Sequence, residues 1–180
     1  MAKTATKLSV KNGILWLSAK NHSPIAYKIA VGAGGVGIKK REGDLITPVG
    51  RYPLRRLFYR QDRYEQLKSG LEKIHICKNN GWCDDEQSIH YNRLINLDDF
   101  SDNNTPPRHE KMHRADHLYN IVIEIGYNDD PPDKGLGSAI FIHVAGCNYS
   151  PTHGCIALKE DDLVDVVRYL TKGDYIEIIS

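Results

Sequence analysis

Residues 140–158 read IFIHVAGCNYSPTHGCIAL, and this stretch decides which fold is expected for the chain. It begins with an apolar run typical of a buried strand, and His143 stands toward the end of that run. Cys155 follows a Thr-His-Gly turn, and a segment with helical spacing begins soon after it. A thiol and an imidazole presented in this way can form a cysteine nucleophile with its own base. The order of strand, turn and helix therefore predicts an enzyme site at this point of the chain.

The rest of the sequence is rich in strand patterns and contains one convincing helix. Asn12-Gly13 lies between two short runs and predicts the turn of an opening hairpin. Residues 119–127 alternate between two faces, and Pro53 places residues 51–59 at an edge or a bend. Residues 160–171 have helical spacing, with acidic residues in the first turn. Further strands are expected at residues 7–11, 14–17, 25–31, 73–77, 139–145 and 174–179.

The signature around the cysteine resembles that of a known family. Thr152-His153-Gly154-Cys155 matches the Ser/Thr-His-Gly-Cys signature of the L,D-transpeptidase catalytic domain (YkuD type), and His143 matches the histidine upstream of it. Residues 47–52, TPVGRY, are similar to the family's Thr-Pro-x-Gly-x-Tyr/Phe segment, and the resemblance runs from Leu8 to the C-terminus. Three further segments resemble a compact bacterial branch of the family: residues 82–85, 91–93 and 126–130.

The resemblance implies a fold, a reaction and a set of partners. The fold is mainly β, a sandwich or barrel of mixed strands, with one clear α-helix after the catalytic cysteine. Cys155 is implied as the nucleophile and His143 as its base, while backbone N–H groups near Gly154 and Cys155 are expected to hold the oxyanion. Peptidoglycan stem peptides are the implied substrates, cross-linked through a thioester, and carbapenem-type inhibitors are expected to react with the cysteine. Neither a metal nor an organic cofactor is implied.

Two departures from the family pattern concern the surroundings of the nucleophile. The gap between His143 and Thr152 is shorter than in the better-known members, so the loop that carries the cysteine must be trimmed. Those members usually place Arg or Asn two residues after the cysteine, where this chain has Ala157. The family's oxyanion and substrate contacts are therefore not carried over at these positions.

The overall composition limits the classes of partner. The 180 residues fit one domain, 1–180, and a hydrophobic content of 41% is ordinary for a globular protein. The net charge is +1, from 24 basic and 23 acidic side chains, so no nucleic-acid partner is expected. The sequence contains no run of about 18 apolar residues, so no membrane span is expected. Four cysteines in a chain of this size need not form disulfides, and a nucleophilic Cys155 must be free.

Two observations on the cellular compartment point in different directions. A cell-wall function implies the periplasm or cell envelope. However, the apolar run that follows the basic N-terminus, residues 14–17, is too short for a secretory signal. The cytoplasm, with recycled cell-wall fragments as substrates, is therefore the alternative location.

The roles of the residues around the motif are less specific. His143 needs an acceptor for its second ring nitrogen, and a backbone carbonyl is expected because no Asp or Glu stands out as a partner. His153 either takes part in the chemistry or packs outward and orients the loop, while Thr152 is expected to contact substrate. Three residues with acids nearby are expected either to bind stem peptides or to form a surface salt-bridge cluster: Tyr91, Asn92 and Arg93.

Other patterns suggest metal or nucleotide binding but lack the context for it. The histidines and cysteines within residues 143–155 do not have the paired spacing of zinc sites. Histidines at positions 109, 113 and 117 would stack on one face of a helix, where a solvated face is favoured over a metal site. Residues 32–37 fit G-x-G-x-x-G, but no helix pattern follows, so a glycine loop leading toward the cleft is favoured over a dinucleotide site.

The function favoured by these patterns is peptidoglycan L,D-transpeptidase. An L,D-carboxypeptidase or another thiol amidase of cell-wall peptides would use the same cysteine. A non-catalytic zinc or peptidoglycan-binding module is the alternative of another class, in which Cys155 packs as a small apolar residue. Residues 98–116 are polar and are expected to cover the cleft as a loop or short helix; a lid of this kind would exclude water and favour an amine acceptor.

Overall fold

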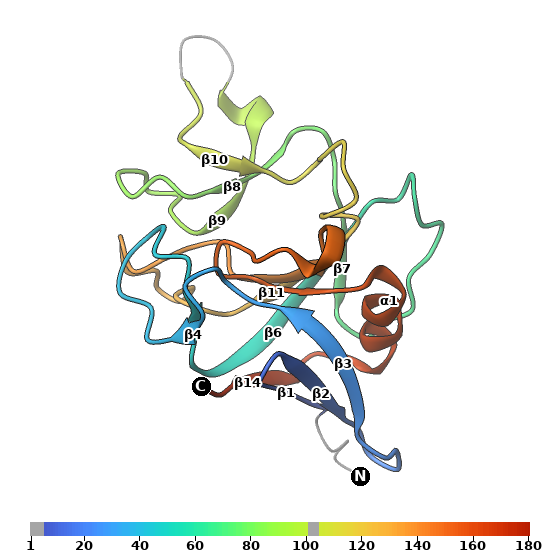
Figure 1. The fold of residues 1–180 in the computed structure, drawn as a ribbon. Coiled ribbons are helices and arrows are strands. Elements are labelled where there is room, and N and C mark those ends of the chain that lie inside the picture. The colour runs from blue at the N-terminus through green and yellow to red at the C-terminus, as the bar shows by residue number, and fades with distance from the viewer. Residues whose placement is uncertain (1–5, 101–104) are drawn as a thin grey trace.

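The fold is a closed barrel of mixed strands, which confirms the mainly β prediction. The computed structural model describes residues 6–100 and 105–180. The principal sheet has nine strands in the order β11-β12-β13-β3-β2-β1-β14-β6-β7, and a further pairing of β11 with β6 makes all of them except β7 a closed ring. Figure 1 shows this arrangement, with helix α1 at one side of the barrel.

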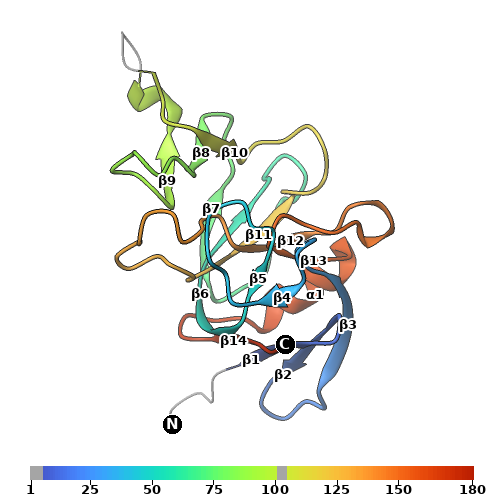
Figure 2. The same ribbon diagram turned by 60° about the vertical axis from the view of Figure 1, so that its left-hand side comes forward.

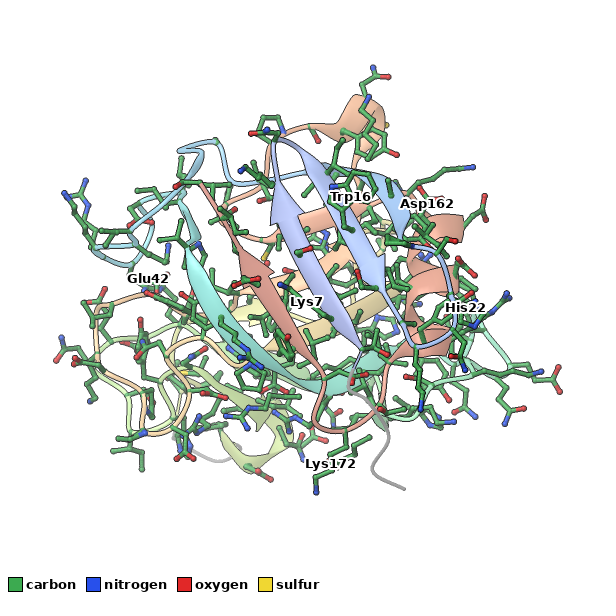
Figure 3. All side chains as sticks on the ribbon, turned by 90° about the horizontal axis from the view of Figure 1, so that it is seen from below. Lys7, Trp16, His22, Glu42, Asp162 and Lys172 are labelled. Carbon is green, nitrogen blue, oxygen red and sulfur yellow. The ribbon has the colours of Figure 1, made fainter. Side chains whose placement is uncertain are left out.

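Most barrel strands lie where apolar residues alternate along the sequence. The predicted opening hairpin is present, with Lys11 opposite Ile14 across its turn. On its second strand Leu15 and Leu17 are buried, whereas Trp16 is 41% exposed and lies on the outer face of the barrel (Figure 3). The strands of the principal sheet are β1 (Lys7–Lys11), β2 (Ile14–Ser18), β3 (Ile25–Ala30), β6 (Gly50–Tyr59), β7 (Glu72–His75), β11 (Ile121–Ile125), β12 (Phe141–Val144), β13 (Ile156–Leu158) and β14 (Tyr175–Ile178).

Strand β6 closes the barrel by changing partner along its length. Residues 50–53 pair with β14, and the following residues pair with β11 and β7. Pro53 lies where the pairing passes from one partner to the next, and its carbonyl oxygen accepts the Gly126 N–H at 2.8 Å. Because proline cannot donate to a sheet ladder, a position between two partners suits it. The bend predicted at Pro53 corresponds to this change of partner.

The predicted helix is present as α1 (Glu160–Tyr169), although it ends at Tyr169 rather than at residue 171. Acidic residues occupy its first turn, where they favour the positive end of the helix dipole. One face of the helix is buried in the main core, through Leu163, Val166 and Val167. This burial, rather than helix propensity alone, holds a helix of this length in place.

The helix does not begin at the cysteine, which corrects the order predicted from the sequence. Strand β13 lies between Cys155 and α1, and each of its three residues is 0% exposed. A short strand buried on both faces has no alternation of apolar and polar residues, so periodicity does not reveal it. Cys155 therefore stands at the start of a strand, and the N–H groups of the helix N-terminus lie beyond that strand.

A three-stranded sheet is inserted between β7 and β11, at the top of Figure 1. Its central strand β8 (Asn80–Cys83) pairs with β9 (Arg93–Asn96) and with β10 (His109–Lys111). These strands carry few alternating apolar residues, so the sequence pattern does not predict them. A short 3-10 helix, η1 (Leu97–Phe100), follows β9.

The insertion corrects two expectations for the polar region before β11. His109 lies in β10, so the helix on which histidines 109, 113 and 117 would stack is not formed. The lid expected over residues 98–116 includes residues 101–104, which lie outside the described residues. The part from residue 105 onward includes a strand rather than a loop alone, and that strand reaches the cleft described below.

A short parallel pair of strands, β4 (Val36–Gly37) and β5 (Thr47–Pro48), lies close to β13 (Figure 2). The glycine run 32–37 ends in β4, and the next element is β5 rather than a helix. Without a helix N-terminus after the glycines, a dinucleotide phosphate site cannot form there.

A second apolar cluster joins the insertion to the barrel. Trp82 of β8 packs edge-on against Phe58 of β6 and Phe141 of β12, with ring centroids 6.2 and 5.0 Å apart. Cys155 belongs to the same cluster. The insertion therefore supplies part of the packing around the predicted nucleophile.

Leu163→Ala should lower the free energy of unfolding by about 2–5 kcal/mol, because it leaves a cavity where α1 meets the core. Leu163 is 0% exposed, so the methyl groups removed are fully buried. Urea unfolding followed by circular dichroism measures the change. Arg168→Ala, on the exposed side of the same helix, is the matched control and should change the free energy by less than about 0.5 kcal/mol. Equal, small effects of the two substitutions would contradict the packing described for α1.

Candidate active site

Two neighbouring parallel strands bring the predicted base and nucleophile together. Ile142 of β12 is opposite Ile156 of β13. Cys155 therefore lies next to Phe141, and it shares a face of the sheet with Phe141 and His143 because side chains alternate along a strand. Both Cys155 and His143 line a hollow of about 270 Å³.

The Cys155 side chain is almost enclosed, with 7% of the residue exposed. Its Sγ donates to the Ala139 carbonyl oxygen at 3.2 Å and accepts the Phe141 N–H at 3.4 Å. Burial, followed by the negative charge of Glu110, raises the pKa of Cys155 to about 12. The resting side chain is therefore a neutral thiol whose proton is directed at a backbone carbonyl.

His143 is also buried and neutral. Its Nδ1 lies 2.8 Å from the Val144 carbonyl oxygen, so Nδ1–H donates there and Nε2 is left to accept a proton. A backbone carbonyl is the partner predicted for this ring from the sequence. Burial lowers the pKa of His143 to about 4. No hydrogen bond joins His143 to Cys155 within residues 6–100 and 105–180, so the resting pair is not a thiolate and an imidazolium.

Thr152 and Gly154 shape the turn that presents the cysteine. Thr152 Oγ1 donates to the Cys155 carbonyl oxygen at 2.7 Å and accepts the Gly154 N–H at 3.2 Å. Gly154 has a φ of +127°, and a Cβ there would lie 2.9 Å from the Ile46 carbonyl oxygen, so the turn requires glycine. The Thr152 hydroxyl, expected to contact substrate, is thus used within the loop. The Gly154 N–H, expected to hold an oxyanion, is used there as well.

The segment TPVGRY supports the same turn. Thr47 is 0% exposed, and its Oγ1 accepts the Gly32 N–H at 2.8 Å and donates to the Cys155 carbonyl oxygen at 3.4 Å. A Cβ on Gly32 would lie 3.0 Å from Gly154 Cα, so the glycine loop can approach the cysteine turn only because it lacks a side chain there. The glycine loop at Gly32 and the segment at Thr47 therefore both support the turn that carries Cys155.

Asn92 is buried, and all the polar atoms of its side chain are used. Its Oδ1 accepts the Trp82 Nε1–H at 2.9 Å and the Ala139 N–H at 3.1 Å. Its Nδ2 donates to the carbonyl oxygens of Tyr127 and Asn128 at 3.1 and 2.7 Å. The three segments that resemble the compact branch therefore meet at this amide. Asn92 fixes the backbone whose carbonyl oxygen accepts the hydrogen bond of the thiol, rather than presenting an open contact for substrate.

Tyr91 and Arg93 lie apart from the nucleophile. Tyr91 is 1% exposed, and its hydroxyl donates to Glu42 Oε2 at 2.7 Å. Arg93 is exposed, bonds the Asp129 carbonyl oxygen and lines a separate hollow with Arg55. Both side chains were expected to bind substrate, but neither of them lines a hollow that contains Cys155.

Two hollows meet at the nucleophile, and the residues lining both are Cys155 and His153. The histidine hollow is the space of about 270 Å³ that contains His143 and Arg114, and no carboxylate lines it. The acidic hollow has a volume of about 410 Å³, and Arg108 is its one arginine. Its carboxylates are Glu42, Asp84, Glu86 and Glu110. His153 is exposed where the two hollows adjoin, a place from which it can touch substrate in either one.

Several residues that line these hollows have no local signal in the sequence. Glu110 comes from β10, and the Tyr119 hydroxyl donates to its Oε1 at 2.7 Å. The Tyr119 ring in turn packs against His143, with centroids 5.4 Å apart. The only pointer to Glu110 and Arg114 is that both belong to the polar region expected to cover the cleft.

Ala157, at the position where the family usually has Arg or Asn, is 0% exposed. It is opposite His143 on β12 and Ala30 on β3, and it packs in a small cluster with Ala30 and Ala145. A long polar side chain has no room between these strands. Close packing of small residues therefore replaces the polar residue usual in the family.

The cysteines and histidines of the described chain do not form a metal site. All four cysteines are free, with Cys77 and Cys147 exposed and Cys83 and Cys155 buried. Within the two described ranges, no group of three His, Cys, Asp or Glu side chains is placed to hold a metal ion. None of the helices in these ranges combines the length and apolar character that a membrane span requires.

The comparisons with known proteins concern the fold and the family of the chain. A search of curated proteins found no match. Among solved structures, Bd1075 of Bdellovibrio bacteriovorus gives a TM-score of 0.51 at 15% identity, over 98% of this chain and 48% of that one. L,D-transpeptidase 1 of Mycobacterium tuberculosis gives 0.43 at 12% identity, over 98% and 62% of the two chains. An L,D-transpeptidase from Stackebrandtia nassauensis gives 0.43 at 12% identity, over 99% and 57%.

This chain spans less than two thirds of each of those solved chains. At such identities, the similarity to Bd1075 shows the fold alone. The family model of the L,D-transpeptidase catalytic domain (YkuD) matches residues 8–178, which is nearly the whole sequence. The chain therefore belongs to the L,D-transpeptidase catalytic domain family.

Proposed function

We propose that this chain is a peptidoglycan L,D-transpeptidase that joins stem peptides through a thioester on Cys155. The observation that carries the proposal is the hollow shared by Cys155 and His143, built on adjacent parallel strands in a chain of this family. Peptidoglycan lies in the cell envelope, and the proposal places the activity there.

The acylation step uses the two neutral groups in concert. The Cys155 sulfur attacks the carbonyl carbon of an L,D-configured peptide bond in the donor stem. The thiol proton leaves the Ala139 carbonyl oxygen and passes to Nε2 of His143 as the C–S bond forms. His143 then gives that proton to the leaving amine as the C–N bond breaks. Because burial disfavours both charged forms, proton transfer accompanies attack rather than preceding it.

The oxyanion of the tetrahedral intermediate needs N–H donors in the water-poor hollow. The Gly154 N–H already donates to Thr152 Oγ1. We therefore assign the oxyanion contact to the backbone N–H of Cys155 itself. An amine of a second stem then attacks the thioester, forms the cross-link and releases the thiol. Water in place of that amine would give an L,D-carboxypeptidase.

Cys155→Ala should abolish release of the terminal D-amino acid from a stem tetrapeptide, and it should abolish covalent adduct formation with a carbapenem. His143→Gln should retain the thiol but slow acylation by about a hundredfold or more, because the general base is lost. Stopped-time mass spectrometry of the intact protein measures both effects.

Each of these variants has a matched control in the chain. Cys147→Ala removes an exposed thiol and should acylate at the parent rate. His153→Ala removes the exposed histidine and should reduce the rate less than His143→Gln does. Turnover by Cys155→Ala at a rate comparable with the parent would refute the nucleophile assignment, and a larger loss in His153→Ala would exchange the roles of the two histidines.

Alkylation of Cys155 in the free enzyme should rise about tenfold per pH unit from pH 7 to pH 9, without a plateau. The reason is that a thiol with a pKa of about 12 gains thiolate steadily over this range. Iodoacetamide labelling followed by peptide mass spectrometry gives the rate at Cys155 separately from that at Cys147. A rate independent of pH above pH 5 would instead indicate a preformed thiolate–imidazolium pair and would contradict the neutral resting state.

Tetrapeptide-bearing muropeptides should yield cross-linked dimers together with the released terminal D-amino acid. The buried setting of Cys155, with the region after residue 105 bordering the cleft, limits water at the thioester and favours an amine acceptor. Liquid chromatography with mass detection measures the products. Tripeptide alone, with no dimer at high acceptor concentration, would assign the protein to the carboxypeptidase alternative.

A further inference from the structure

The acidic hollow holds a carboxylate that the acylation step does not use. Glu110 lines this hollow together with Cys155. Burial raises the pKa of Glu110, while the hydrogen bond from the Tyr119 hydroxyl lowers it. Of the ion pairs formed within residues 6–100 and 105–180, none includes Glu110. Arg108, which lines the same hollow, is paired with Asp84, and Arg114, whose charge lowers the pKa of Glu110, is paired with Asp116.

Among the other carboxylates of the acidic hollow, Asp84 is ion-paired, whereas Glu42 and Glu86 share with Glu110 the lack of an ion pair within the described residues. Glu42 accepts hydrogen bonds from the Tyr91 and Ser138 hydroxyls, which fixes it in the wall. Asp84 is neutralised by Arg108 at 3.1 Å. Glu110 is the carboxylate of this hollow whose charge acts on the Cys155 thiol, and its partner Tyr119 packs against His143. Glu110 is therefore the acid placed to contact a group that approaches the sulfur.

The two sides of the sulfur differ in their acidic residues. The histidine hollow contains Arg114 and no carboxylate, whereas the acidic hollow contains four carboxylates and one arginine. A cation that approaches Cys155 is therefore favoured through the acidic hollow. A half-buried carboxylate without a cationic partner is stabilised when a ligand supplies that partner.

We propose that Glu110 binds the ammonium group of the acceptor stem and makes the transfer step selective for cationic amines. The inference rests on the proposed transpeptidase function. The ammonium gives one proton to the Glu110 carboxylate, which later releases it to solvent. The amine nitrogen then attacks the thioester carbon. Its second proton passes through His143 to the sulfur as the C–S bond breaks, which restores the thiol.

The test compares two nucleophiles that resolve the same acyl-enzyme. The free side-chain amine of a stem peptide is protonated and cationic at pH 7, whereas hydroxylamine is largely neutral there. Glu110→Gln should reduce kcat/KM for the stem-peptide amine by roughly tenfold, chiefly through KM, because a charged hydrogen bond is lost. The ratio of the stem-peptide rate to the hydroxylamine rate should therefore fall by roughly tenfold in this variant, because only the cationic acceptor uses the carboxylate charge. Glu110→Asp, which keeps the charge, should retain a preference for the cationic acceptor.

Glu86→Gln is the matched control, because Glu86 is another carboxylate that lines the same hollow. It should change neither rate by more than about twofold. An equal loss with both nucleophiles in Glu110→Gln, or no loss with the cationic amine, would overturn the role of Glu110.

A second measurement needs no variant, so it stands even if Glu110→Gln fails to fold. In the parent protein, the rate with the stem-peptide amine divided by the rate with hydroxylamine should fall severalfold between low and high salt. The reason is that salt screens a contact between charges. An unchanged ratio would overturn the inference. Failure of the parent to form any acyl-enzyme would instead refute the proposed function, so the two failures are distinguishable.

Discussion

The arrangement of the residues around Cys155 depends on the hydrogen bonds of the Asn92 side chain. This amide joins the insertion, through Trp82, to the backbone at Ala139. Ala139 has a φ of +52°, a conformation that is unfavourable by about 1–2 kcal/mol for a residue with a Cβ. It persists because its N–H is held by Asn92 and its carbonyl oxygen accepts the Cys155 thiol. A side chain far from the motif in sequence thus determines where the sulfur points.

The barrel supplies the rest of the geometry through its strand pairing. His143 and the residue after Cys155 lie on adjacent parallel strands whose neighbours, β11 and β3, are also barrel strands. The barrel is closed, so these strands have partners on both sides and cannot slip without breaking the ladder elsewhere. The turn between them is fixed by Thr152 and Thr47, which both bond the Cys155 carbonyl oxygen. The thiol and the imidazole are therefore held in place while still uncharged, and in the proposed mechanism the proton moves only when the substrate arrives.

The sequence predicts those features that are encoded locally. The hairpin at Asn12-Gly13, the helix from Glu160 and the pair His143 and Cys155 each depend on a short stretch of residues, and a short stretch is enough to identify them. The sequence does not predict strand β13, because the strand is buried on both faces and its apolar and polar residues do not alternate. The strands of the insertion are not predicted either, because their order depends on contacts such as Trp82 with Phe141, which are distant in the sequence.

The same distinction explains why the sequence does not predict where the polar side chains around the site lie. Residues 91–93 are polar, and polarity indicates a hydrogen-bonding role but not the direction of the side chain. Asn92 turns inward and binds backbone, and Arg93 faces another hollow. Glu110 and Tyr119 reach the cysteine only through the docking of the insertion on the barrel, so no local pattern marks them. Tertiary packing, rather than residue type, decides which polar groups surround the sulfur.

The thiol's hydrogen bond to the Ala139 carbonyl has a consequence for oxidative damage. Oxidants such as peroxide react with the thiolate, and the first product is a sulfenic acid. The sulfur of Cys155 is held protonated and almost enclosed, whereas Cys77 and Cys147 are exposed. In oxidising surroundings, modification therefore falls first on cysteines outside the reaction. The proposed nucleophile is thereby kept reduced until a substrate carbonyl occupies the hollow beside it.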